Sequence, residues 1–134
     1  MKQFGIAARL DTTERARITI VDDDDSFRES LHDLLKACNY DVLVFISAEA
    51  LLATETWLDS DCLLVDATLP GTSGPELQRQ LRARRSAIPI VFVTGYEDDE
   101  LKARVIAEGA VDCLCKPFEE EELLASLNRV LGRG

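Results

Sequence analysis

Carboxylates that directly follow short apolar runs are the residues of this sequence best suited to chemistry. Asp66 follows the run 62–65. Asp22 and Asp23 follow the run 18–21. Both runs have the length of buried parallel strands, and ligands bind at the carboxyl ends of such strands in open α/β sheets. A carboxylate held there by a rigid strand can act as a nucleophile or as a metal ligand.

Two further strand ends supply complementary groups. Thr94 follows the apolar run 88–93, and Lys116 follows the run 111–115. Three carboxylates at one edge would repel one another, and a divalent cation with hard oxygen ligands, Mg²⁺, relieves that repulsion. The Thr94 hydroxyl and the Lys116 ammonium would then help to neutralise an incoming phosphoryl group, which Asp66 would attack as the nucleophile.

The elements that must position these groups alternate along the chain. Apolar runs predict five strands, and apolar residues at helical spacing predict a helix after each of them. The predicted strands cover residues 18–21, 42–45, 62–65, 88–93 and 111–115. This alternation predicts an α/β fold in which a doubly wound parallel five-stranded sheet carries helices on both faces.

Two of the predicted helices carry specific expectations. Asp25 or Ser26 is expected to cap the first helix. Its outer face, which carries Arg28, His32 and Lys36, is expected to be solvated, so the single histidine is interpreted as surface rather than as a catalytic base. The fourth helix, which starts in the acidic run 97–100 and stops at Gly109, is expected to bury Leu101, Val105 and Ile106.

Length and charge exclude several classes of protein. A chain of 134 residues is one domain, and its net charge of −10 argues against a nucleic-acid surface. No apolar run approaches the roughly 18 residues of a membrane span, and no signal-peptide pattern precedes the first strand, so a cytoplasmic location is expected. Residues 1–17 are interpreted as a mobile leader, 18–131 as the folded domain, and 132–134 as the start of a linker or tail.

Four motifs, in order at four strand ends, resemble the receiver domain of two-component response regulators. They are Val-Asp-Asp, Asp-x-x-Leu-Pro-x-x-x-Gly, Thr-Gly and Lys-Pro-Phe, and the resemblance covers about Arg17 to Leu131. The local sequences around them are most similar to the nitrogen-fixation-type (FixJ-like) receivers. The resemblance implies a flavodoxin-like (βα)5 fold with the strand order 2-1-3-4-5.

The resemblance also implies roles for the acidic residues. A sensor histidine kinase would donate a phosphoryl group to Asp66. Asp23, Asp66 and the backbone carbonyl of Thr68 would bind Mg²⁺ directly, whereas Asp22 would act mainly through water. The domain would catalyse only its own phosphorylation and dephosphorylation, so it is expected to be a signalling domain and not an enzyme.

A switch surface is implied by the same resemblance. Thr94 and Lys116 would contact the phosphoryl group and couple it to the surface formed by the fourth helix, the fifth strand and the fifth helix, through which the family dimerises. Pro117 is a candidate for a cis proline. Cys113 stands where the family usually has an aromatic switch residue, and a small thiol cannot make that rotation. Tyr96 is hypothesised to shield the phosphoryl group from water.

Other functions remain open at this level. The chain could be a degenerate receiver that acts as a phosphorylation-independent interaction module. An aspartyl-nucleophile phosphatase would need a second aspartate where Thr68 stands. A flavin-binding module would need a Ser/Thr/Gly-rich phosphate loop where residues 22–25 are acidic. The expected output is transcription, through a DNA-binding domain that is either missing here or separate.

Overall fold

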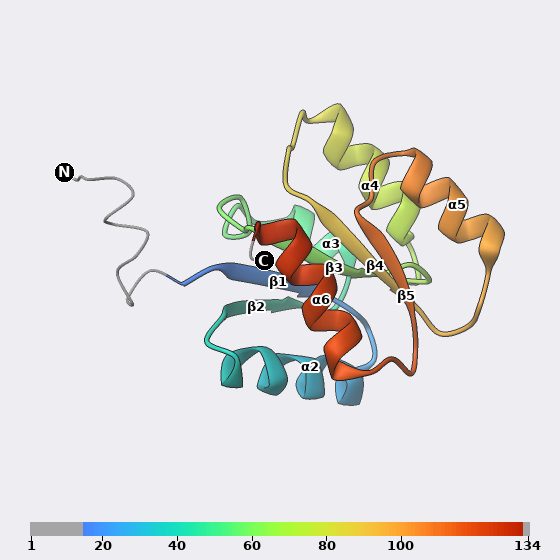
Figure 1. Cartoon of the computed structure of the whole chain (residues 1–134). Helices are drawn as coiled ribbons and strands as arrows, with labels where there is room; N and C mark the ends of the chain where they lie inside the picture. The colour runs from blue at the N-terminus through green and yellow to red at the C-terminus, as the bar shows by residue number, and fades with distance from the viewer. Residues whose placement is uncertain (1–14, 133–134) are drawn as a thin grey trace.

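Five parallel strands form a single sheet in the computed structural model, which describes residues 15–132 (Figure 1). The strands are β1 (Arg17–Val21), β2 (Asp41–Phe45), β3 (Cys62–Asp66), β4 (Ile90–Thr94) and β5 (Asp112–Cys115). Their order is β2-β1-β3-β4-β5, which confirms the expected flavodoxin-like topology. β1 begins at Arg17, one residue inside the segment expected to be a leader. The rest of that leader up to residue 14, and residues 133–134, lie outside the described residues.

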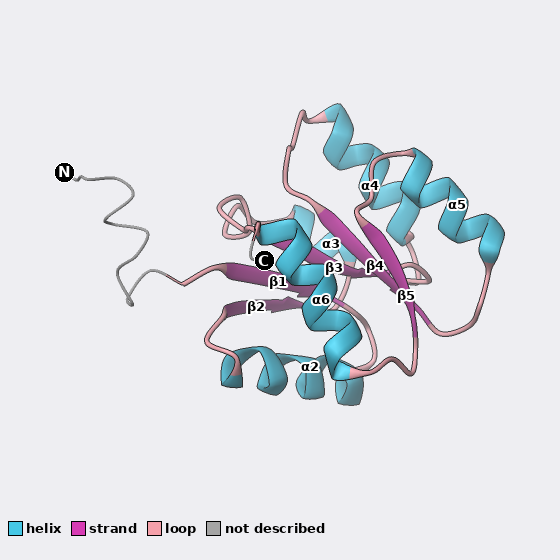
Figure 2. Cartoon of the chain, in the orientation of Figure 1, coloured by secondary structure: helices cyan, strands magenta, loops and turns pink. Residues whose placement is uncertain are grey.

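In the described part of the chain, five helices cover the two faces of this sheet (Figure 2). They are α2 (Asp25–Ala37), α3 (Ala48–Leu52), α4 (Gly74–Ala83), α5 (Asp99–Ala107) and α6 (Glu120–Leu131). Buried residues of α2 and α6 belong to one apolar cluster, and those of α3, α4 and α5 belong to the other. Within residues 15–132, no helix is both long and apolar enough to cross a membrane.

The central strands are apolar on both faces because each face carries helices. In β3, Leu63 and Val65 pack into the cluster under α3, α4 and α5, whereas Leu64 packs toward α2 and α6. Successive strand side chains point to opposite faces, so this alternation follows directly from strand geometry. Double burial explains why β3 reads as an unbroken apolar run, and it holds the end of the strand rigid.

Some predicted boundaries and contacts are wrong. Asp24, not Asp25 or Ser26, caps α2, and its Oδ1 accepts a hydrogen bond from the Phe27 amide at 3.0 Å. Ile106 is 39% exposed and does not face inward, although Leu101 and Val105 do. β4 begins at Ile90 and not at residue 88, because the intervening Pro89 has no N–H to give to a central strand.

Candidate functional site

Three aspartates meet at the carboxyl edge of the sheet. Val21, the last residue of β1, pairs with Val65 of β3, so Asp22 and Asp66 come next to each other. Carboxylate oxygens of Asp22, Asp23 and Asp66 all lie within 4.8 Å of one another. Asp22 and Asp66 are only 1% and 5% exposed, whereas Asp23 faces solvent. The structure therefore brings together the three acidic residues that the sequence singled out.

Lys116 reaches this cluster from the end of β5. Its Nζ lies 3.2 Å from Asp22 Oδ2 and 3.9 Å from Asp66 Oδ2. The same Nζ lies 3.9 Å from the centroid of the Phe27 ring, close enough for a cation–π contact. Phe27 in turn meets Phe118 edge to face at 6.0 Å. Two aromatic side chains thus help to fix the ammonium over the carboxylates.

The charge of the cluster is not balanced by Lys116. The pKa of Asp22 is raised, mainly because burial disfavours its charged form. The bond that its Oδ1 accepts from the Asp24 amide at 2.9 Å and the nearby Lys116 act in the opposite direction, while repulsion from Asp66 adds to the rise. Two buried carboxylates and a third nearby face one lysine, an arrangement that favours additional positive charge.

The carboxylate of Asp66 is oriented by its own loop. Its Oδ1 accepts hydrogen bonds from the Thr68 amide at 2.9 Å and from the Thr68 hydroxyl at 3.0 Å. Its Oδ2 faces Lys116. Because both donors of Thr68 hold one oxygen, the other oxygen is the one presented to the centre of the cluster.

Thr94 and Tyr96 lie beside the aspartates but face different surroundings. Thr94 ends β4 and is buried, and its hydroxyl donates to the backbone carbonyl of Tyr96 at 3.3 Å. The Tyr96 side chain is 61% exposed and lines, with Thr68, an open depression of about 310 Å³. The threonine hydroxyl is thus paired within its own loop, and the tyrosine stands at the margin of the site.

Gly74 allows α4 to start directly against the end of β3. A Cβ at this position would lie 2.7 Å from the backbone oxygen of Asp66 and 2.8 Å from Cε1 of Phe92. The intervening loop is tied to α3, because Glu49 accepts a hydrogen bond from the Thr72 amide at 2.7 Å. This bond is the main reason why the pKa of Glu49 is lowered. Gly74, the glycine that ends the second motif, is therefore required by close packing next to Asp66.

Sequence reasoning missed Arg28, which it placed on the solvated face of α2. Its Nη1 donates to the backbone carbonyl of Asp22 at 2.8 Å, and its Nη2 pairs with Asp25. Arg28 follows the cap Asp24 by four residues, one helical turn, so the correct cap position would have indicated that its side chain lies near the strand end. Arg28 fixes the backbone that carries Asp22.

Cys113 and Pro117 flank Lys116 on β5 and the following loop. Cys113 is buried, and it lines with Thr94 and Lys102 a cavity of about 350 Å³ between β5, α5 and α6. Burial raises the pKa of its thiol, which therefore stays protonated at neutral pH. The Lys116–Pro117 peptide bond is cis.

Comparisons with known proteins agree on one family. Residues 18–128 match the model of the response regulator receiver domain. The chain is 37% identical over 120 residues to nodulation protein W of Bradyrhizobium diazoefficiens, covering 90% of this chain and 53% of that protein. It is also 37% identical over 120 residues to the transcriptional regulatory protein FixJ of Azorhizobium caulinodans, covering 90% of this chain and 57% of that one. The chain thus spans about half the length of the curated relatives it matches.

Solved structures give the same result. The response regulator StyR has a TM-score of 0.80 and 39% identity, covering 88% of this chain and 60% of that one. The structure of FixJ-N has a TM-score of 0.79 and 31% identity, covering 89% and 95% respectively. With a family match over most of its length, this chain belongs to the response-regulator receiver domains of two-component signalling.

Proposed function

We propose that Asp66 accepts a phosphoryl group from a sensor histidine kinase and that the chain thereby acts as a signalling switch. One observation carries the proposal. The buried carboxylate of Asp66 has one oxygen held by Thr68, and its other oxygen lies 3.9 Å from the Lys116 ammonium. A nucleophile fixed in this way beside a cation meets the two main needs of phosphoryl transfer, which are positioning and charge neutralisation.

The transfer reaction follows from these positions. Asp66 Oδ2 attacks phosphorus, the phosphorus–nitrogen bond to the kinase histidine breaks, and the histidine nitrogen leaves with the bonding electron pair. The product is an acyl phosphate on Asp66. Lys116 Nζ, which now pairs with Asp22 at 3.2 Å, would then pair with a phosphoryl oxygen. Hydrolysis of the acyl phosphate would return the domain to its starting state.

The aspartate cluster fits Mg²⁺. Its oxygens are hard ligands, they lie within 4.8 Å of one another, and burial together with the neighbouring Asp66 raises the pKa of Asp22, so a further cation would be favourable there. Asp23, Asp66 and the Thr68 backbone carbonyl would hold the ion, with Asp22 acting through water. When bound, Mg²⁺ would neutralise charge on the phosphoryl oxygens.

A hydroxyl rearrangement would link the site to a surface. Thr94 Oγ1 now bonds the Tyr96 carbonyl, and a phosphoryl oxygen on Asp66 offers a charged and therefore stronger acceptor. We infer that Thr94 turns toward it and pulls the loop before α5, which shifts the population of the surface formed by α5, β5 and α6. The small Cys113 implies that this surface switches without an aromatic rotation, and homodimerisation through it is the expected response.

The biological setting is proposed on the same basis. A kinase partner implies a cytoplasmic location for this receiver domain. Relatives such as FixJ are transcriptional regulatory proteins, which supports transcription as the output through a domain beyond the receiver or on another chain. The net charge of −10 supports the view that this chain does not itself bind nucleic acid.

Amide spectra with Mg²⁺ and beryllofluoride, an analogue of the phosphoryl group, test the switch. We expect shifts at Asp66, at Thr94 and along α5 and β5 in the parent protein. Asp66→Asn should show none of the shifts that depend on beryllofluoride. Unchanged amides in α5 and β5 of the parent protein would instead identify a receiver that does not switch.

A further inference from the structure

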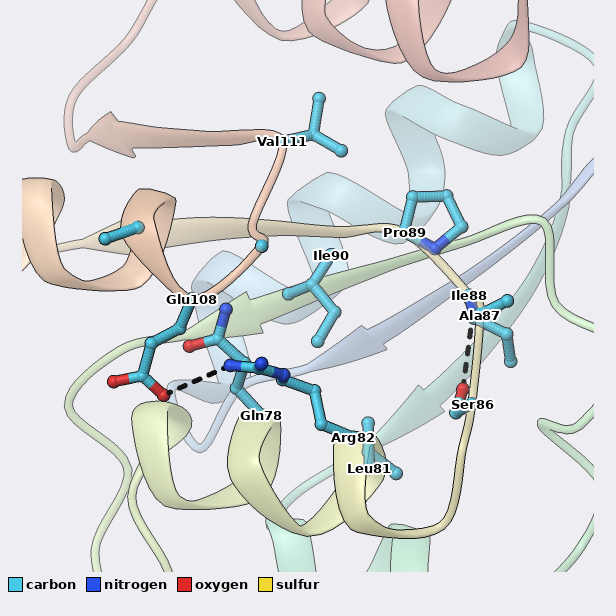
Figure 3. A pocket seen from close by; sticks show the side chains of 12 residues that line it. Gln78, Leu81, Arg82, Ser86, Ala87, Ile88, Pro89, Ile90, Glu108 and Val111 are labelled. Carbon is cyan, nitrogen blue, oxygen red and sulfur yellow. Dashed lines mark hydrogen bonds and ion pairs between the residues drawn. The ribbon is translucent and has the colours of Figure 1, made fainter.

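A second cavity lies at the opposite, amino edge of the sheet. It has a volume of about 420 Å³ and opens between α4, α5 and the residues that precede β4 and β5 (Figure 3). Ile90 begins β4 and Val111 immediately precedes β5, so the cavity is separated from the aspartate cluster by the length of the strands. Its walls combine an apolar surface, made by Leu81, Ile88 and Ile90 among others, with a few polar groups.

Gln78 brings an unpartnered acceptor to this cavity. The residue is 2% exposed, and its Nε2 donates at 3.0 Å to the backbone carbonyl of Val105. Its Oε1 is the one buried side-chain nitrogen or oxygen within residues 15–132 that lacks a hydrogen-bond partner. A flip of the Gln78 side-chain amide would not provide a partner, because the oxygen would then face the Val105 carbonyl. A buried acceptor of this kind is costly and is met by a donor from elsewhere.

The rim of the cavity is held by a weak ion pair. Arg82 Nη1 and Glu108 Oε1 are 3.8 Å apart, and Arg82 is largely exposed. Figure 3 shows this pair alongside the Gln78 amide, with Arg82 and Gln78 both rising from α4 toward α5. An exposed pair at this distance contributes little to stability, so an entering molecule can displace it. Displacement would open the way to Gln78 and free the Glu108 carboxylate.

We propose that this cavity binds a small amphipathic cation, meaning a primary amine or amidine carried on a compact apolar body. Its N–H groups would donate to Gln78 Oε1 and to the Glu108 carboxylate, and its apolar body would pack against Ile88 and Ile90. An anion could pair with Arg82, but it would leave Gln78 Oε1 unsatisfied and would face Glu108. The net charge of −10 also favours cations over anions. None of the residues that would hold the cation belongs to the aspartate cluster.

Amide NMR titration with three matched probes tests the proposal. Benzylamine, benzyl alcohol and benzoate share an aromatic body and differ in charge and donors. The full chain is kept in saturating Mg²⁺ so that the aspartate cluster does not attract the amine. We expect benzylamine to shift the amides of Ala87, Gly109 and Val111 and to bind at least tenfold more tightly than the other two probes. Equal affinities for all three, or no shift at these amides, would overturn the proposal and leave a cavity filled only by water.

Two variants separate recognition from general effects on α4. Gln78→Met removes the acceptor with little change in size and should weaken benzylamine binding at least tenfold. Gln80→Met makes the same change elsewhere on α4 and should leave the affinity unchanged. If Gln78→Met fails to fold, Glu108→Gln, which removes the charge at the rim, should weaken binding in the same direction. Unchanged affinity in a folded Gln78→Met variant, or in Glu108→Gln, would contradict the proposal.

Discussion

Two aspartates at opposite edges of the sheet differ in the number of donors that surround their carboxylates. Asp112, at the start of β5, accepts hydrogen bonds from the Ser126 hydroxyl, the Arg129 guanidinium and the Cys113 amide. Asp22, after β1, accepts one backbone bond and one from Lys116, and it has Asp66 as a close neighbour. Only the first carboxylate is fully compensated by donors.

The pKa directions express this difference. Burial acts to raise the pKa of both carboxyl groups. At Asp112 the bonds from Ser126, Cys113 and Arg129 outweigh burial, and the pKa is lowered. At Asp22 burial and Asp66 prevail, and the pKa is raised. A compensated carboxylate ties α6 to the sheet, whereas an undercompensated one favours the binding of a cation.

The largest expected effect on stability is that of Mg²⁺. A ligand at 100 times its Kd stabilises the folded state by about 2.7 kcal/mol, so urea unfolding should show an increase of this size. A chelator should remove the increase, and Asp23→Asn should reduce it. Asp112→Asn serves as the control at the other edge and should retain the full increment. Equal increments in both variants would remove the distinction between the two edges.

Gly74→Ala sharpens the comparison at the site itself. The added Cβ would lie within 2.8 Å of the Asp66 backbone oxygen and of Phe92, so we expect a loss of about 2 kcal/mol in the free energy of unfolding. Gly95→Ala is the matched control, since its Cβ would meet nothing within 4 Å, and its effect should stay under about 0.5 kcal/mol. Similar losses in both, measured by urea unfolding, would refute close packing at Gly74.

Asp112→Asn should lower the free energy of unfolding by about 1.5 kcal/mol at pH 7, because the hydrogen bonds to the charged carboxylate of Asp112 are lost. A lowered pKa in the folded state gives stability that is present above the unfolded pKa of about 3.9 and is lost as the pH falls through the folded value. The difference in free energy of unfolding between the parent and Asp112→Asn should therefore shrink as the pH of the urea unfolding experiment is lowered from about 5 to about 3. A difference that stays constant over this range would contradict the lowered pKa.

Asp22→Asn should instead raise the free energy of unfolding at neutral pH by about 1 kcal/mol. A raised folded pKa means that ionised Asp22 lowers the stability of the folded state at neutral pH, and asparagine removes the charge while keeping an acceptor for the Asp24 amide. In chelator, the variant should therefore unfold at higher urea concentration than the parent. A loss comparable to that of Asp112→Asn would show that the two carboxylates are alike.

Much of this arrangement could be predicted from local patterns. Strands buried on both faces appear as apolar runs, and the residue after each run falls at one edge of a parallel sheet. Asp22, Asp66, Thr94 and Lys116 were placed in this way. The strand order followed from the family resemblance carried by the same residues.

Long-range contacts could not be predicted from such local patterns. The bond from Gln78 to the Val105 carbonyl joins residues that are 27 apart, and nothing in the local sequence of α4 indicates it. Arg28 was misplaced because its long side chain reaches from the first turn of α2 back to the backbone carbonyl of Asp22, a contact that the apolar pattern of the helix does not reveal. Ile106 is exposed because it lies about 100° around the α5 axis from the buried Val105, which places it outside the buried face.

The most direct test of the account is the intact mass after incubation with Mg²⁺ and a small phosphodonor. We predict the addition of one phosphoryl group to the parent protein, none to Asp66→Asn, and none to the parent when Mg²⁺ is chelated. Asp112→Asn should be phosphorylated like the parent, since its carboxylate lies at the other edge. The absence of any added mass on a folded parent protein would contradict a phosphoacceptor at Asp66 and leave an interaction module with the receiver fold.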